Sequence, residues 1–311
     1  MQTSLSCRPK VLKKSGLLLA LAFSCISPFA TAEALTVTYA GSMGVVMDNG
    51  LGPDFAKTHH VDYQGQGQGA YAMARLLAAK KVVADVFVSI TPGPIEVLKQ
   101  AGLVGQAQPV ASTRMVIAYN PHSRFAQQLA QSTTAQPWWK TLSEPGLRFG
   151  RTDPTSDPQG QNIIFTLKLA EKYYHQPGLA QKIMGEVINP QQIAAEGGLL
   201  ARLQAGQVDA ASGYESATRS AKLPYIVLPD EINLSNPDYS QRWYDTVSFE
   251  VADKQGKAKT YRPQPLVFYA VVLKNSPHPQ LAQQFVDYLT SAQAQKIFKE
   301  NGYDQPKGKS F

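Results

Sequence analysis

Two strongly apolar segments, RMVIAY at residues 114–119 and LVFYAVVL at residues 266–273, decide the fold that this 311-residue sequence predicts. Both are rich in β-branched and aromatic residues, which is typical of strands buried inside a sheet. They bracket the middle third of the chain. If the chain crosses between two lobes at both segments, residues 33–114 with 266–311 form one lobe and residues 115–265 form the other.

Short strands alternate with longer helical patterns around these two segments. We expect strands at residues 35–39, 85–89, 147–150 and 209–212, and helices at residues 45–58, 70–81, 94–101, 125–129, 161–174, 199–204, 215–222, 280–289 and 292–301. This alternation favours parallel sheets covered by helices. The predicted fold is α/β with two lobes, a hinge of two crossing strands, and a ligand cleft between the lobes.

Residues 1–32 are predicted to be a signal peptide rather than part of this fold. A basic segment precedes the apolar run at residues 16–30, and Ala30-Thr31-Ala32 matches an A-x-A cleavage site. The run is shorter than the roughly 20 residues that a membrane-spanning helix needs. We therefore expect a periplasmic mature protein; lipidation at Cys25 is an alternative, although the residues before it form a poor lipobox.

Removal of the signal peptide changes the charge and the cysteine content. The formal net charge of +7 falls to +3, because residues 1–32 hold four basic and no acidic residues. No Lys/Arg stripe indicates nucleic-acid binding. Cys7 and Cys25, the two cysteines of the chain, both leave with the signal peptide. The mature chain therefore has no disulfide, thiolate-bound zinc or Cys nucleophile, and we expect no cofactor.

Four loops are expected at the cleft, because each follows a strand or opens a helix. They are Ala40-Gly41-Ser42, Gly67-Gln68-Gly69-Ala70, Asp157-Pro158-Gln159-Gly160 and Gly213-Tyr214-Glu215-Ser216. Helix N-termini offer free N–H groups that attract anions. The candidate ligand-binding residues are Gly41, Ser42, Gly69, Ala70, Asp157, Pro158, Gln159 and Glu215. The structural alternatives are an N-cap at Ser42 or Asp157 and a flexible turn for the Gly run.

Asp157 and Glu215 are the two carboxylates expected at this cleft. A carboxylate pair there would bind a cation, an amine or a high-valent metal centre, or would act as the general acid and base of a secreted hydrolase. The sequence contains no G-x-S-x-G or H-E-x-x-H motif and no mature cysteine, which disfavours an enzyme. A receptor for a metal cation, a metal chelate or another small anion stays open at this stage.

The same segments resemble the tungstate/molybdate-binding proteins of ABC importers. The resemblance rests on Ala40-Gly41-Ser42, residues 149–154 (FGRTDP) leading into Asp157-Pro158-x-Gly160, Tyr214-Glu215-Ser216, and residues 228–234 (LPDEINL). It covers almost all of the mature chain in the same order. Ala70 replaces a usual Ser, and Gln159, Gln161 and Asn162 replace the Cys, Tyr and Arg usual around the DPxG motif.

This resemblance implies a two-lobed periplasmic binding protein of the type II-like fold, acting as a monomer with the membrane permease of an ABC importer. It implies that Asp157 and Glu215 supply oxygens to the metal of a tetrahedral oxyanion, molybdate or tungstate. Gly41 and Ser42, with the Gly69-Ala70 loop, would donate N–H and hydroxyl hydrogen bonds to its oxo groups. A high-valent metal can expand its coordination, whereas two carboxylates would repel sulfate or phosphate.

The signal peptide gives a first testable prediction. The exported protein should begin at or close to Glu33, because cleavage is expected after Ala32. Intact-mass spectrometry of protein from a periplasmic extract checks this. Soluble cytoplasmic protein that retains Met1 would contradict it.

Overall fold

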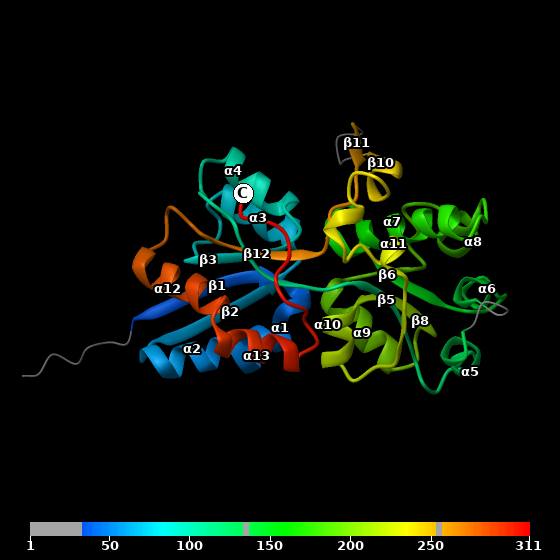
Figure 1. Cartoon of the computed structure of the whole chain (residues 1–311), viewed down its shortest axis with the longest axis horizontal. Coiled ribbons are helices and arrows are strands. Elements are labelled where there is room, and N and C mark those ends of the chain that lie inside the picture. The colour runs from blue at the N-terminus through cyan, green and yellow to red at the C-terminus, as the bar shows by residue number, and fades with distance from the viewer. Residues whose placement is uncertain (1–32, 133–136, 253–256) are drawn as a thin grey trace, which may run out of the picture. The chain divides into compact units, whose positions relative to one another are not determined.

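The computed structural model describes residues 33–132, 137–252 and 257–311, so the expected signal peptide and its cleavage site lie outside the described residues. The described residues form two sheets with helices around them (Figure 1). In these ranges no helix is both long enough and apolar enough to cross a bilayer.

The first sheet has the strand order β2-β1-β3-β12-β4. Its strands are β1 (Ala34–Ala40), β2 (Asp62–Gln68), β3 (Val86–Ile90), β4 (Gln108–Ser112) and β12 (Val267–Val272). The helical segments connected to it are η1 (Gly41–Met43), α1 (Gly44–Val46), η2 (Met47–Leu51), α2 (Gly52–His59), α3 (Ala70–Ala78), α4 (Gly93–Gln100), α12 (Pro279–Leu289) and α13 (Ala292–Glu300). The elements between residues 34 and 112 and those between residues 267 and 300 therefore belong to one sheet and its helices.

The second sheet has the order β7-β6-β8-β5-β9. Its strands are β5 (Met115–Tyr119), β6 (Phe149–Thr152), β7 (Ile193–Ala194), β8 (Ala210–Tyr214) and β9 (Tyr225–Val227). Its helices are α5 (Ala126–Ala130), α6 (Trp138–Leu142), α7 (Pro158–Tyr173), α8 (Leu179–Met184), α9 (Glu196–Gln204), α10 (Glu215–Ser220) and α11 (Asp230–Asn233), followed by short 3₁₀ turns η3 (Pro237–Tyr239) and η4 (Tyr244–Thr246). A hairpin of β10 (Phe249–Ala252) and β11 (Ala258–Tyr261) precedes the return to the first sheet.

The chain passes between the sheets at two short segments. Only Thr113 and Arg114 separate β4 from β5, and residues 262–266 separate β11 from β12. The C-terminal segment lies beside the first of these crossings, because Asp304 forms an isolated β-bridge with Ser112 at the end of β4. The strands of each sheet lie within the predicted lobes, and the boundaries themselves, at 114/115 and 265/266, stay a prediction.

Both sheets are mixed, whereas the sequence predicted parallel sheets. β12 runs antiparallel to β3 and β4, and β5 runs antiparallel to β8 and β9. Each of these strands enters its sheet directly from a crossing segment. It therefore starts at the end where the neighbouring strands β3 or β8 finish, and it must run in the opposite direction.

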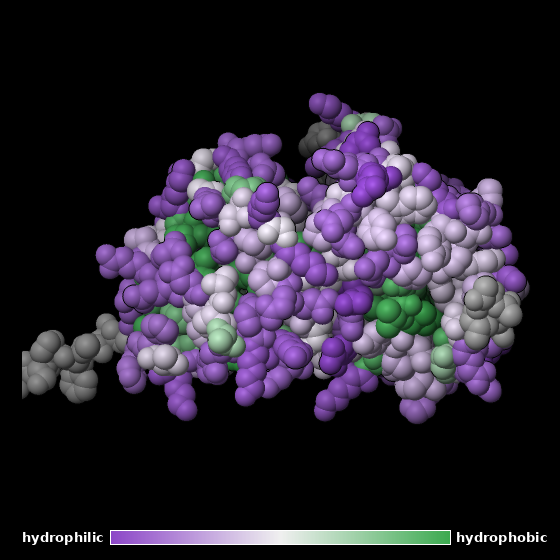
Figure 2. Space-filling view, viewed as in Figure 1, coloured by the Kyte–Doolittle hydropathy of each residue, from purple (hydrophilic) through white to green (hydrophobic). Residues whose placement is uncertain are grey.

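The apolar core continues from one sheet into the other. A single cluster of buried side chains includes Val37 and Val271 from the first sheet and Ile117 and Phe149 from the second. A smaller cluster lies between α9 and the second sheet, around Leu199 and Leu203. Figure 2 shows mostly hydrophilic residues on the face in view, with hydrophobic residues in small separate areas. The buried apolar side chains thus lie mainly around and between the two sheets.

Strand β2 excludes the structural alternative that the Gly run is a flexible turn. Residues 64–68 (QGQGQ) lie in this edge strand, which pairs in parallel with β1. A Cβ on Gly67 would lie 2.8 Å from the Tyr39 ring, and a Cβ on Gly65 would meet the Asp48 carboxylate and the Tyr63 hydroxyl. The glycines therefore make room for Tyr39, whose hydroxyl donates a hydrogen bond to Asp48 at 2.6 Å.

Substitution of Gly67 by alanine tests this packing. Tyr39 is fully buried and hydrogen-bonded, so it cannot move away without loss of packing. We expect Gly67→Ala to lower the free energy of unfolding by about 1–3 kcal/mol, as overpacking does. Gly105→Ala is the control, because its Cβ would meet no atom within 4 Å. Equal urea midpoints for the two variants would contradict the packing argument.

Candidate functional site

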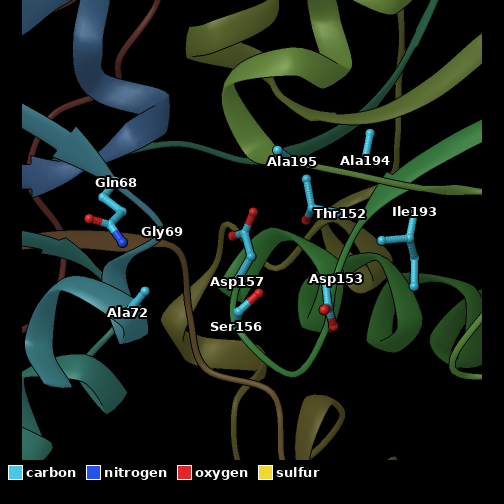
Figure 3. Close-up of a pocket in the computed structure, with 10 residues that line it drawn as sticks. All are labelled: Gln68, Gly69, Ala72, Thr152, Asp153, Ser156, Asp157, Ile193, Ala194 and Ala195. Carbon is cyan, nitrogen blue, oxygen red and sulfur yellow. The ribbon is translucent and has the colours of Figure 1, made fainter. Parts of the chain in front are cut away.

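A cavity of about 410 Å³ lies between residues of the two lobes. The first lobe contributes Gln68, Gly69 and Ala72, from the end of β2 and the start of α3. The second lobe contributes Thr152, Asp153, Ser156, Asp157 and residues 193–195. Figure 3 shows the Asp157 carboxylate pointing into the space between Gln68 and Thr152, whereas the Asp153 carboxylate points away from it. Asp157 is therefore the carboxylate that faces this cavity.

The first turn of α7 places Asp157 there. Asp157 is the N-cap of this helix, as predicted, and its Oδ1 accepts a hydrogen bond from the Gln159 N–H at 2.9 Å. Pro158 occupies the first helical position, where a missing N–H costs nothing. A Cβ on Gly160 would clash with the Thr152 carbonyl and would lie 2.7 Å from the Pro154 nitrogen. The glycine of the DPxG segment thus lets the helix start directly against the 152–154 loop.

Asp157 is a buried carboxylate with no cation beside it. Its side chain belongs to a residue that is only 4% exposed, and no described Lys or Arg forms an ion pair with it. Burial raises the pKa of Asp157 to about 6, and Asp153 adds to this; the Gln159 N–H and the Thr152 hydroxyl act in the opposite direction. Apart from the nearby Thr152 hydroxyl, Oδ2 has no hydrogen bond of good geometry from any described residue. This oxygen is itself buried, with almost no exposed surface of its own.

A second cavity, of about 500 Å³, lies on the side of α7 that carries Gln159. Gly41 and Ser42 of η1 line it from the first lobe, together with Asp48. Gln159 and residues of α9 and α10 line it from the second lobe. The first turn of α7 thus stands between two cavities: Asp157 faces one together with Gly69, and Gln159 faces the other together with Gly41 and Ser42.

Several polar side-chain atoms beside this turn are buried and have no hydrogen-bond partner among the described residues. The Gln159 side chain donates a long hydrogen bond, 3.4 Å, to the Ser212 carbonyl, but Gln159 Oε1 and Ser212 Oγ have no partner among the described residues. Gln159 is 4% exposed and Ser212 is fully buried. Buried polar groups are nearly always hydrogen-bonded in native proteins, so this region can accommodate a polar ligand.

The remaining candidates lie further from Asp157. Ala70 is buried at the first position of α3 and lines none of the cavities described, so only its backbone N–H is available. Pro158 lines a separate cavity of about 400 Å³ with Tyr71 and the β10–β11 hairpin. The candidate list did not include Gln68, Thr152 and Ser212. Gln68 belongs to a loop that was expected at the cleft, and Thr152 belongs to the FGRTDP segment, whereas Ser212 had no such signal.

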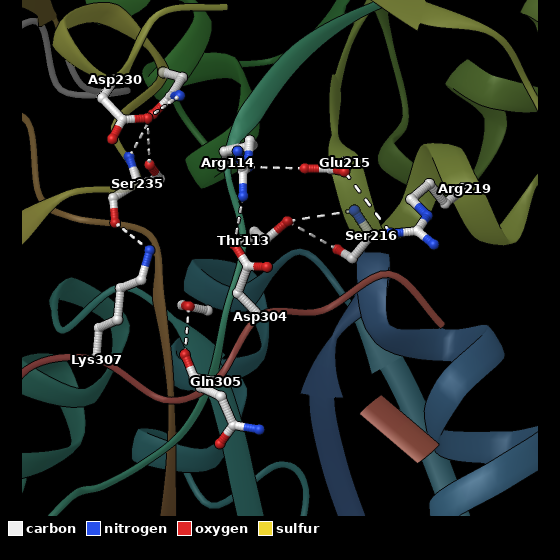
Figure 4. A network of polar contacts seen from close by, with 12 residues as sticks. Thr113, Arg114, Glu215, Ser216, Arg219, Asp230, Ser235, Asp304, Gln305 and Lys307 are labelled. Atoms are coloured by element: carbon white, nitrogen blue, oxygen red, sulfur yellow. Dashed lines mark hydrogen bonds and ion pairs between the residues drawn. The ribbon is translucent and has the colours of Figure 1, made fainter. Parts of the chain in front are cut away.

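Glu215 is not among the residues that line the cavity of Asp157, so the carboxylate pair stays a prediction. It begins α10, and its N–H donates to the Arg114 carbonyl at 2.9 Å. Its Oε2 lies 2.8 Å from Arg114 Nε, and its Oε1 accepts a hydrogen bond from Tyr225 at 3.0 Å. Arg114 also binds Asp304 at 2.7 Å, as Figure 4 shows. Arg114 thus holds Glu215 within the crossing region.

The side chains present do not form a pre-built cation site. In the described residues no group of three or more His, Cys, Asp or Glu is placed to hold a metal ion. The features that remain are one buried carboxylate, two glycine-containing loops and uncommitted hydroxyl and amide groups. These can bind a small polar anion that also offers a partner to Asp157.

The raised pKa of Asp157 predicts an unusual stability effect. In the folded protein the Asp157 carboxyl group stays protonated between pH 3.8 and about 6. The folded protein therefore loses stability as the pH rises through that window, because the unfolded chain releases the proton earlier. Asp157→Asn keeps an N-cap and removes the buried charge. We expect the ligand-free variant to be more stable than wild type by about 1–3 kcal/mol at pH 7.5, and equal to it near pH 4.

Asp209 provides the matched control. Burial alone would raise its pKa, but hydrogen bonds from Arg148 and Ser123 lower it overall. Asp209→Asn should therefore destabilise the protein at pH 7.5, the reverse of Asp157→Asn. Urea unfolding of both variants at several pH values gives the comparison. A loss of stability for Asp157→Asn at pH 7.5 would show that this carboxylate is only a helix cap.

Comparisons with known proteins identify the family to which the chain belongs. The family model for bacterial extracellular solute-binding proteins matches residues 35–304. An uncharacterised solute-binding protein of Petrotoga mobilis is 33% identical over 193 residues, which cover 62% of this chain and 59% of that protein. The chain thus spans about three fifths of the length of this relative. The molybdate/tungstate-binding protein WtpA of Pyrococcus abyssi is 27% identical over 296 residues, covering 87% of this chain and 84% of that protein.

A solved structure is similar in fold. The periplasmic molybdate-binding protein of Azotobacter vinelandii superposes with a TM-score of 0.64 at 18% sequence identity, covering 88% of this chain and 100% of that one. The predicted α/β fold with two lobes and the resemblance to molybdate- and tungstate-binding proteins are both confirmed. Since the family model covers nearly all of the described residues, the chain belongs to the bacterial extracellular solute-binding proteins.

Proposed function

We propose that this protein captures a tetrahedral metal oxyanion, molybdate or tungstate, between its two lobes for an ABC importer. The observation that carries the proposal is the buried, cation-free carboxylate of Asp157, which points into a cavity opposite Gly69. Such a group is costly in an empty protein. A ligand with an electrophilic metal centre would compensate the buried negative charge of Asp157. A relative of the chain, WtpA of Pyrococcus abyssi, is named a molybdate/tungstate-binding protein.

The oxo groups of the ligand would be held by backbone N–H groups. Gly69 is the N-cap of α3, and its neighbour Ala70 begins this helix of nine residues. The first N–H groups of a helix have no partner within the helix, and the helix dipole favours an anion there. Gly69 also approaches the second lobe closely, since its Cβ would lie 3.3 Å from the Ser156 carbonyl. Gly69 and Ala70 thus suit a small ligand held between the lobes.

Gly41, Ser42 and Gln159 would bind the ligand from the side of the second cavity. Gly41 and Ser42 follow β1 directly, at the end of the strand that faces the crossing region. Gln159 contributes an amide that is buried and only weakly engaged. We assign Pro158 a role in positioning Asp157, because it begins α7 without an N–H that would need a partner.

We propose that the ligand is released unchanged. A carboxylate-dependent hydrolase needs an acid and a base at one site. The second carboxylate expected for that role, Glu215, is instead engaged by Arg114 and Tyr225. This supports a binding protein rather than an enzyme.

The partner would be a membrane permease of an ABC importer, and the location would be the periplasm. The family to which the chain belongs is extracellular. We propose that the protein acts as a monomer, since the large hydrophobic side chains exposed on its surface, such as Val83, Ile188 and Val227, lie in separate elements.

A ligand panel tests the proposed function. Sodium tungstate and sodium molybdate should raise the unfolding temperature of the mature protein, whereas sodium sulfate and ferric citrate should not. At a thousandfold excess over Kd the stabilisation is about 4 kcal/mol. Calorimetric titration then gives the affinities. Stabilisation by the ferric ion alone, or by none of these compounds, would contradict the proposal.

A pair of serine variants locates the site. Ser42→Ala should weaken tungstate binding by about tenfold, the usual cost of losing a hydrogen bond to a charged group. Ser143→Ala is the control, because this hydroxyl donates to the Trp139 carbonyl at the end of α6. Equal affinities for both variants would remove Ser42 from the site.

A further inference from the structure

Residues of the β10–β11 hairpin contact the start of α3 in the other lobe. The hairpin is anchored on α7, because the Phe249 ring packs against Phe165 with centroids 5.0 Å apart and stacks on Tyr261 at 5.3 Å. In Figure 1 the hairpin stands above α7, at the top of the view. From this base Lys259 of β11 extends to Tyr71 of α3, whose ring centroid lies 5.7 Å from Lys259 Nζ. This contact joins the two lobes.

Two aromatic rings share the Lys259 ammonium group. Its Nζ lies 4.9 Å from the Tyr261 centroid in addition to the 5.7 Å from Tyr71, and both distances are within the roughly 6 Å over which a ring face attracts a cation. Burial raises the pKa of Tyr71 to about 12, and the nearby Tyr261 adds to this, whereas Arg75 acts in the opposite direction. The Tyr71 ring is therefore largely removed from water and lies close to the hairpin.

The first lobe fixes the position of Tyr71. It is the second residue of α3 and directly follows Gly69 and Ala70. A Cβ on Gly93, at the start of α4, would overlap the Tyr71 hydroxyl. The Gly93 N–H also donates a hydrogen bond to Gln264 Oε1 at 3.2 Å. Gly93 thus gives the hydroxyl the room that it needs and ties the same region to the crossing segment.

The Tyr71 contact and the loop proposed to bind the ligand belong to one helix. Gly69 caps α3 and approaches the second lobe, where its Cβ would lie 3.3 Å from the Ser156 carbonyl oxygen. The lobes are therefore closed at the cavity that Gly69 and Asp157 line. Tyr71 stands two residues further along the same helix, so an opening of this cavity also carries Tyr71 away from Lys259.

We propose that Tyr71, Lys259 and Tyr261 form a clasp, in which one cation binds two rings, holds the lobes closed and slows the release of the ligand. This inference rests on the proposed function and adds residues that position the lobes, since none of the three lines the cavity of Asp157. An exposed contact of this kind changes an equilibrium by about two- to fivefold. It therefore slows release without preventing it, as a receptor that must deliver its ligand requires.

The charge of Lys259 has a second effect, which a matched variant separates from the clasp. Lys259 and Arg262 line the same cavity of about 400 Å³ beside the hairpin. Both cations attract an incoming anion, which raises the association rate. Arg262 donates to the Asp245 carbonyl at 3.5 Å, whereas Lys259 lies over the two rings. Arg262 thus supplies the charge at this cavity but not the clasp.

The release of isotopically labelled tungstate, chased with an excess of unlabelled tungstate, tests the clasp. Tyr71→Leu should release tungstate about tenfold faster than wild type, because it removes a ring from both Lys259 and Tyr261. Lys259→Met should release it about two- to fivefold faster. Tyr71→Phe keeps the ring and should release tungstate at the wild-type rate. Arg262→Gln should slow association and leave release unchanged.

Small-angle scattering of the ligand-free protein gives a second readout that does not depend on tungstate. Tyr71→Leu should have a larger radius of gyration than Tyr71→Phe, because its lobes open more often. A wild-type release rate for Lys259→Met would overturn the clasp, as would an equal acceleration of release by Arg262→Gln or equal radii for the two Tyr71 variants. If the wild type binds no tungstate, the proposed function is wrong, and the scattering comparison still decides whether the clasp exists.

Discussion

The buried carboxylate of Asp157 is the constraint around which the ligand site is arranged. An uncompensated charge in a low-dielectric interior is costly, and it persists only where the surrounding structure enforces it. Here the N-cap hydrogen bond fixes one oxygen, Pro158 begins the helix, and Gly160 lets α7 start tightly against the 152–154 loop. These features place Asp157 at the cavity that it lines with Gly69 and Thr152. The rest of the helix packs against β5, β6 and β8, which makes the position rigid.

The crossing region explains why the charge of Glu215, unlike that of Asp157, is compensated. β4 and β5 are almost continuous, and Arg114 stands in the two-residue segment between them. Its guanidinium joins Glu215 of the second lobe to Asp304 of the C-terminal segment, which bridges back to Ser112. The same arrangement reverses the direction of β5 and β12 within their sheets. The topology of the chain thus places the compensated carboxylate of Glu215 at the crossing region and the carboxylate of Asp157 at the cavity.

Features that depend on local sequence were predictable, and features that depend on distant partners were not. The apolar runs of β5 and β12, the helix at α3 and the Asp157-Pro158 cap follow from periodicity and capping chemistry. Strand β2 was not predicted because Gln and Gly lack strand propensity. The glycines in this strand make room for the Tyr39 ring, which packs against it. The ion pair of Glu215 could not be predicted, because Arg114, which neutralises it, is far away in the sequence. Ser212 gave no sequence signal because hydroxyls on strands are usually structural.

The central claim is that an oxyanion binds between the lobes in contact with Asp157. The most direct measurement is a crystal structure of the tungstate complex, in which anomalous scattering locates the tungsten atom without prior assumption. The account predicts a tungsten peak in the cavity between Gly69 and Asp157. A peak outside this cavity at full occupancy would contradict it.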